Sequence, residues 1–143
     1  MATIRAYTTI EQSRKLAEIL PLESSDMYYQ YVLPKSDKIR HNPEVGNPTN
    51  TLKWYNEGYV FSGKEPITVD EFCVPCWSLA SLLGVLPEID GSPLNIERVK
   101  AEDGYDGYYY HIEYKDKILI PYSKNPVDAC VAMVKKLNEL NLL

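Results

Sequence analysis

Apolar residues recur at helical spacing near both ends of the chain. Close to the N-terminus, a capping box of Thr8 with Glu11 predicts the start of a helix, which ends before Pro21. Near the C-terminus, Asn125 suits an N-cap and Pro126 suits the first helical position. The buried stripe of this closing helix is expected to consist of Val127, Cys130, Val131, Val134 and Leu137. The chain is therefore expected to begin and end in helices.

Between these ends, the first two thirds of the chain predict further helices and one long loop. A short helix is expected over residues 25–32, and a better-defined one begins at Pro75 and ends before Pro87. Another short helix is expected over residues 52–57. Proline, glycine and asparagine punctuate residues 34–50, which predicts an irregular loop. A loop of this length in a small domain is often functional.

The final third of the chain changes to the two-residue alternation of β-strands. The predicted strands are Leu94–Lys100, Tyr108–Tyr114 and Ile118–Tyr122, with the last turn at residues 115–117. One face of the middle strand would carry Tyr108, Tyr110, Ile112 and Tyr114, and the other Tyr109, His111 and Glu113. N-terminal helices, a small antiparallel β-meander and a C-terminal helix packed on the sheet define an α+β fold. We expect one domain over residues 1–143.

The composition argues against several classes of function. The chain has 143 residues, 45% of them apolar, and a formal net charge of −5, which suits one globular domain. No basic arm or face stands out, so nucleic acid is not an expected partner. No apolar run approaches the roughly 18 residues of a membrane span. Three cysteines, and an N-terminus without an apolar signal region, predict a protein of the cytoplasm.

The segment Cys73-Val74-Pro75-Cys76-Trp77 is the first candidate for chemistry. A Cys-x-x-Cys motif occurs in thioredoxin-like redox pairs, which also need a preceding strand in a βαβ unit. Two thiolates would also supply half of a four-ligand zinc site, but no second closely spaced pair exists. Cysteine is among the most buried residue types, and tryptophan anchors a core well. We therefore expect Cys76 and Trp77 to be core residues, and we expect no metal or cofactor.

One further interpretation of this segment is chemical. Cys-x-x-Cys-Trp at a predicted helix start resembles the segment around the nucleophile of papain-like cysteine peptidases. The resemblance implies that Cys76 is the nucleophile, His111 the base, and Asp116 or Asn125 the group that orients the base. The residues between the cysteines depart from the small ones of that pattern, and His111 follows Cys76 by only 35 residues. This interpretation makes a small papain-like thiol hydrolase the alternative function.

Tyrosine is unusually frequent, with twelve in the chain, and half of them cluster around the predicted hairpin. Tyrosine combines a large contact area with a polar group, which suits interfaces. It also favours strands, so part of the cluster would be core. The candidate interaction surface consists of Tyr105, Tyr108, Tyr109 and His111. Without a Gly-rich phosphate loop or an established catalytic motif, the sequence favours a non-enzymatic protein that binds another protein or a second copy of itself.

Short phrases spread over most of the chain carry a second resemblance. They are Thr9-Ile10-Glu11-Gln12-Ser13, Ser25-Asp26-Met27-Tyr28-Tyr29, Leu33-Pro34-Lys35-Ser36-Asp37, Val74-Pro75-Cys76-Trp77-Ser78-Leu79 and Asp128-Ala129-Cys130. Together they resemble an uncharacterised family of small proteins encoded by gut anaerobic bacteria, often in prophages and mobile elements. The resemblance implies a cytoplasmic bacterial or phage context and an accessory protein of such elements. It implies no catalytic residue.

Overall fold

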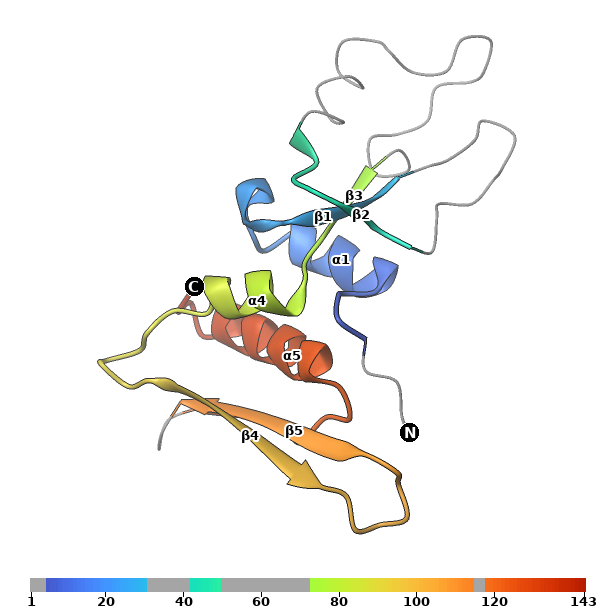
Figure 1. Ribbon diagram of the computed structural model, residues 1–143. Helices are drawn as coiled ribbons and strands as arrows, with labels where there is room; N and C mark the ends of the chain where they lie inside the picture. The colour runs from blue at the N-terminus through green and yellow to red at the C-terminus, as the bar shows by residue number, and fades with distance from the viewer. Residues whose placement is uncertain (1–4, 31–41, 50–72, 115–117) are drawn as a thin grey trace, which may run out of the picture. The chain divides into compact units, whose positions relative to one another are not determined.

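The computed structural model describes residues 5–30, 42–49, 73–114 and 118–143, and in these ranges the protein is an α+β fold (Figure 1). Helices and antiparallel strands are both present and a helix closes the chain, as the sequence predicts, but strands also occur in the N-terminal half, where only helices and a loop were expected. The chain forms two compact units. One is Thr9–Ser78, and the other is Leu79–Leu143 together with the N-terminal segment as far as Thr8. The expectation of a single domain stays a prediction.

The unit Thr9–Ser78 begins with helix α1 (Ile10–Ala17). Its capping box joins Thr9 to Gln12, one residue later than the predicted pair. The backbone N–H of Gln12 donates to the Thr9 hydroxyl at 3.1 Å, and the Gln12 side-chain oxygen accepts from the Thr9 N–H at 3.0 Å. Thr8 is fully buried instead. The first helix is confirmed, with a corrected cap.

The sheet of this unit is built from strands that are distant in sequence. Strand β1 (Met27–Gln30) lies between β2 (Glu44–Val45) and β3 (Cys73–Cys76), and both pairings are antiparallel. A single 3₁₀ turn, η1 (Leu22–Ser24), precedes β1. Helix α1 packs against β3. Among the described strands, β3 lies at the edge of this sheet, where Pro75 is tolerated because an edge strand does not need every N–H in a ladder.

One predicted helix of the N-terminal half is wrong, and a second begins later than predicted. Residues 27–30 form β1 rather than part of a helix, because Tyr29 is buried opposite Val74 and the backbone pairs with β3. The segment expected to start a helix at Pro75 continues β3 as far as Cys76, and helix α4 (Leu79–Val85) starts after it. Both errors have the same cause, since each strand is stabilised by a partner more than forty residues away.

The long loop expected over residues 34–50 is only partly described. Residues 34–41 and 50 lie outside the described residues, as do the helix expected over 52–57 and the turn at 115–117. The described part is not wholly irregular, because β2 pairs with Met27 and Tyr28. Asn47 ties the chain that follows β2 to the turn before β1, since its side-chain amide donates to the Leu22 and Ser25 carbonyls at 3.1 and 2.9 Å.

Trp77 is a core residue, as expected. Its side chain is fully buried, and its indole N–H donates to the Ser24 hydroxyl at 2.9 Å. The next residue, Ser78, donates its backbone N–H to the Asp26 carboxylate at 2.9 Å. A buried indole N–H with a partner avoids the desolvation cost of an unpaired donor. The end of β3 is thereby joined to the segment that leads into β1.

The unit that begins at Leu79 contains the predicted meander. Strands β4 (Leu94–Lys100) and β5 (Tyr108–Tyr114) have the predicted bounds, whereas the returning strand β6 (Ile118–Leu119) is shorter than predicted. The strand order is β4-β5-β6, all antiparallel, with Glu97 opposite His111. In Figure 1, α5 lies between α4 and the strands, and it contacts both α4 and β5.

Helix α5 (Pro126–Glu139) confirms the closing helix and its packing on the sheet. The Asn125 side chain caps it by accepting the Val127 N–H at 2.8 Å. Every residue of the predicted stripe is buried: Val127, Cys130, Val131, Val134 and Leu137. The side chains of β5 that are buried with this stripe are Tyr110, Ile112 and Tyr114. Among the helices in the described ranges, none combines the length and apolar character that crossing a membrane requires.

Candidate functional site

The two cysteines of the Cys-x-x-Cys segment lie on opposite faces of a strand. Residues three apart in a β-strand point to opposite sides, so Cys73 and Cys76 cannot share one small site as they could on a helix. Both are buried and neither forms a disulfide. Burial raises the pKa of the Cys73 thiol to about 12, so this thiol stays protonated at neutral pH. The geometry disfavours both a redox pair and a shared metal site.

The residues of the alternative thiol-hydrolase site receive no support from their surroundings. Cys76 is fully buried in β3, away from the helix start that would favour a thiolate. His111 belongs to the other compact unit, and Asp116 lies outside the described residues. Asn125, the other group expected to orient the base, is the N-cap of α5. The expectation that Cys76 is a core residue is confirmed.

The hairpin of β4 and β5 places the tyrosine cluster on two faces. The inner face contacts α5 and carries the buried side chains of β5. On the opposite side, Val99 is paired with Tyr109, and Glu97 with His111. We call this opposite side the outer face of the hairpin, defined by Val99, Tyr105, Tyr109, His111 and Tyr122. Val99 and Tyr122 are 39% and 48% exposed.

One end of the outer face is organised around two tyrosines whose rings are in tilted contact. The rings of Tyr105 and Tyr109 have centroids 5.7 Å apart, and the Lys124 ammonium lies 4.5 Å from the Tyr105 centroid. The Tyr109 hydroxyl donates to the Asp103 carboxylate. This bond lowers the pKa of the Asp103 carboxyl and raises the pKa of the Tyr109 phenol. The tyrosines are thus held in defined positions although they lie at the surface.

The turn that carries Tyr105 needs two glycines for different reasons. Gly104 has φ +89°, a conformation that side chains disfavour. At Gly107 the limit is space, because an added Cβ would lie 2.8 Å from the Tyr105 ring. The Gly107 carbonyl also accepts from the Ala101 N–H at 3.0 Å, which closes the hairpin end. The sequence of the turn therefore lets Tyr105 fold over it towards Tyr109.

The other end of the outer face is centred on His111. Its ring centroid lies 4.5 Å from that of Tyr122, and the Tyr122 hydroxyl donates to Glu97 at 3.2 Å. The Glu113 carboxylate lies 3.7 Å from Nε2 of His111. Only 12% of the His111 side chain is exposed, and neither ring nitrogen has a hydrogen-bond partner among the described residues. His111 is therefore a largely buried side chain whose two ring nitrogens make no hydrogen bond with a described residue. Such groups are uncommon in native proteins.

Tyr108, also predicted in the interaction surface, points to the other side of the sheet. Strand alternation places it with Tyr110 on the face that contacts α5. It is 39% exposed, and the Arg98 guanidinium lies 4.3 Å from its ring centroid. The structure therefore brings Tyr105 and Tyr109 together, places His111 further along the same face, and separates Tyr108 from them.

Two residues of the outer face were not in the predicted surface. Val99 could have been found from strand register, since it pairs with Tyr109. Tyr122 had no comparable signal, because its contact with His111 depends on how the chain leaves β6. In the parts of the chain that the structure describes, no three His, Cys, Asp or Glu side chains are grouped so that they could hold a metal ion.

Comparison of the chain with models of protein families, with curated proteins and with solved structures gives no match.

Proposed function

We propose that this protein is a non-enzymatic protein-interaction module that binds its partner through the outer face of the β4–β5 hairpin. The observation that carries the proposal is a set of surface aromatic side chains held in place before binding. The rings of Tyr105 and Tyr109 are in tilted contact, and Tyr122 packs on His111. Because these rings are already positioned, little side-chain entropy remains to be lost on binding.

His111 adds a source of specificity to this surface. A polar group of the partner that reaches past the edge of the Tyr122 ring could satisfy the ring nitrogens of His111, which have no hydrogen-bond partner among the described residues. A hydrogen bond to a group that is already shielded from water adds more to the binding free energy than one to a hydrated group, because no hydrogen bond to water is lost. Tyrosine contacts around such a group are typical of the centre of an interface.

The partner is another protein or a second copy of this chain. The resemblance to proteins of gut anaerobic bacteria leads us to propose a bacterial cytoplasm as the setting, and a phage or mobile-element accessory role. A thiol hydrolase using Cys76 and His111 has no comparable support, because Cys76 is fully buried in a strand. A thiol buried in a strand, away from solvent and substrate, is a poor nucleophile.

The test compares two tyrosine variants on opposite faces of the same hairpin. The protein is immobilised as wild type, as the double variant Tyr109→Ser/Tyr122→Ser, and as Tyr108→Ser, the matched control. Each is exposed to lysate of gut anaerobic bacteria, and bound proteins are quantified by mass spectrometry. Sedimentation velocity of the same proteins detects self-association, and circular dichroism checks that each variant is folded.

We expect a specific partner, or a dimer, whose binding falls roughly tenfold or more in the double variant, the effect of about 1.4 kcal/mol. Tyr108→Ser should retain it. Equal capture by all three proteins would contradict the proposal, as would a strict monomer that captures nothing.

A further inference from the structure

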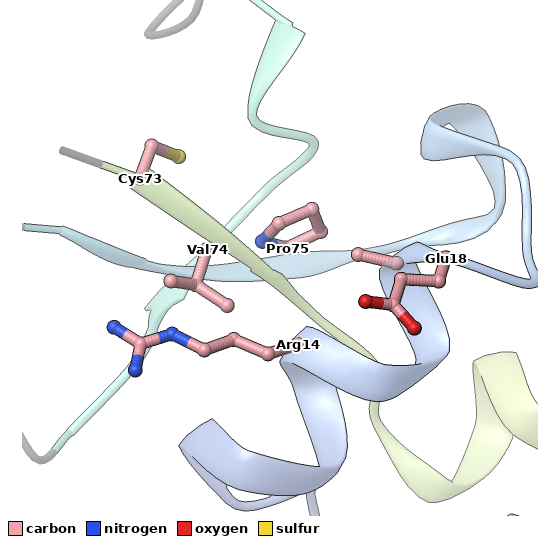
Figure 2. Close-up of a pocket in the computed structure, with 6 residues that line it drawn as sticks. Arg14, Glu18, Cys73, Val74 and Pro75 are labelled. Atoms are coloured by element: carbon pink, nitrogen blue, oxygen red, sulfur yellow. The ribbon is translucent and has the colours of Figure 1, made fainter. Parts of the chain in front are cut away.

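Helix α1 and strand β3 enclose a cavity of about 290 Å³ in the unit Thr9–Ser78 (Figure 2). Its described lining consists of Arg14 and Ala17 from α1, Glu18 at the C-cap of α1, and Cys73, Val74 and Pro75 from β3. The volume is at the lower limit for ligand pockets, so only a small molecule would fit. The cavity lies in a different unit from the outer face of the hairpin, and the interaction proposed above makes no use of it.

Two opposite charges lie on one wall of this cavity. Arg14 and Glu18 are four residues apart, which places them on the same side of α1, and both are exposed. Neither side chain has a hydrogen bond or ion pair with another residue in the described ranges. Arginine preceding glutamate is also the weaker order for an ion pair along a helix. Both charges therefore remain available to a ligand.

The rest of the lining is uncharged and mainly apolar. In Figure 2, Val74 points towards Arg14, whereas Cys73 and Pro75 point to the opposite side of the strand. Val74 is 2% exposed, so its side chain is a buried apolar surface. The Cys73 thiol is neutral because burial raises its pKa to about 12. Among the described residues that line the cavity, Arg14 and Glu18 are the charged ones, which suits a ligand that carries one positive and one negative group.

We propose that this cavity binds a free α-amino acid with a small aliphatic side chain. The guanidinium of Arg14 would hold the carboxylate, a pairing whose fork geometry favours two parallel hydrogen bonds. The Glu18 carboxylate would accept from the ammonium, and the aliphatic side chain would contact Val74 and Ala17. The charge pattern requires both ligand charges, so an amine or a carboxylic acid alone would leave one protein charge unmatched.

The test uses ligands that lack one charge at a time. L-Leucine, N-acetyl-L-leucine and L-leucinamide are titrated into the ¹⁵N-labelled full chain, followed by amide chemical shifts. We expect saturable shifts at Ala17 and Val74 with leucine, with a Kd of roughly 1 mM or tighter, within the range of ordinary metabolite affinities. Each derivative should bind roughly tenfold or more weakly, since each loses one charge-assisted contact.

Variants then show which protein charge contacts which group of the ligand. Arg14→Gln should weaken leucine by roughly tenfold or more and leave the weak binding of leucinamide unchanged, because leucinamide has no carboxylate. Glu18→Gln should weaken leucine by roughly tenfold or more and leave the weak binding of N-acetyl-leucine unchanged, because N-acetyl-leucine has no ammonium group. Lys15→Gln, the exposed neighbour, is the control and should bind leucine like the wild type.

Absence of saturable shifts with leucine, or equal binding of all three ligands by the wild type, would overturn the proposal without any variant. Loss of binding in Lys15→Gln to the same extent would also overturn it. None of these outcomes depends on the capture experiment with the hairpin variants.

Discussion

The two faces of the β4–β5 hairpin carry the same kinds of residue but differ in what covers them. Tyr110 and Tyr114 are buried on the face that contacts α5, and the Tyr114 hydroxyl donates to the Pro87 carbonyl at 2.6 Å. Tyr109 points the other way, and its hydroxyl reaches Asp103 at the surface. The comparison teaches that strand alternation, rather than residue type, decides whether a tyrosine stabilises the fold or remains available for binding.

This division predicts a separation of effects. Changes on the inner face should reduce stability, because they remove buried contact area or a buried hydrogen bond. Changes on the outer face should leave stability almost unaltered and reduce binding. Each prediction below tests one side of that separation.

The largest effect is expected where α5 covers the inner face. Leu137 is fully buried on the helix stripe, so Leu137→Ala should lower the free energy of unfolding by about 2–5 kcal/mol. Asn138, the next residue, is exposed, and Asn138→Ala should change it by less than about 0.5 kcal/mol. Chemical denaturation measures both. Equal effects would show that α5 does not dock through this stripe.

A smaller loss is expected from the buried phenol of Tyr114. Tyr114→Phe removes the hydroxyl and leaves the Pro87 carbonyl without this donor, which should cost about 1 kcal/mol. Tyr109→Phe, the matched change on the outer face, should cost less than about 0.5 kcal/mol. The difference in denaturation midpoint between these variants is the readout. A larger loss for Tyr109→Phe would reverse the assignment of the two faces.

The same tyrosine should produce a pH dependence. Burial raises the pKa of Tyr114 above its ordinary value of 10.0, so its contribution to stability is present below the unfolded pKa and is lost as the pH rises. Wild type should therefore lose more stability than Tyr114→Phe as the pH rises above about 10. Denaturation of both proteins across this range measures the difference. Parallel curves would mean that Tyr114 is not desolvated in the folded state.

A still smaller effect on stability is expected at Gly107, with a clear effect on the outer face. The Cβ of Gly107→Ala would lie 2.8 Å from the Tyr105 ring, a flexible side chain that can move away. We expect less than about 1 kcal/mol of destabilisation and loss of the Tyr105–Tyr109 ring contact. Nuclear Overhauser effects between the two rings measure that contact. If they persist, the glycine is not what allows Tyr105 to fold over the turn.

The smallest effect is electrostatic and confined to the surface. The bond from Tyr109 lowers the pKa of Asp103, so Tyr109→Phe should return that pKa towards its model-peptide value near 3.9. NMR titration of the Asp103 carboxyl measures the shift. An unchanged pKa would show that the phenol does not bond to this carboxylate, and the case for a pre-positioned Tyr109 would be weaker.

The C-terminal half could be predicted from sequence because its elements are local. β4, β5 and α5 have clear periodicity, and Asn125 and Pro126 identify the helix start. The N-terminal half could not, because β1 pairs with β3 across more than forty residues. Pro75 suits a helix start and an edge strand equally well, so local chemistry could not separate the two.

In the candidate site, too, local features could be predicted from the sequence and tertiary contacts could not. Tyr105 and Tyr109 were found from composition and alternation, whereas the place of Tyr122 on His111 is a tertiary contact with no sequence signal. The cavity between α1 and β3 was also beyond prediction, because the sequence placed Pro75 in a helix rather than in a strand beside α1.

Site-specific photo-crosslinking tests the central claim most directly. A benzophenone amino acid replaces Val99 on the outer face or Ile96 on the other face of the same strand, and both positions are exposed. The folded variants are irradiated with the lysate used for capture and, separately, alone. We predict a discrete adduct, with a partner or with a second copy, from position 99 and none from position 96. Adducts from position 96 alone, or equally from both, would contradict an interface on the outer face.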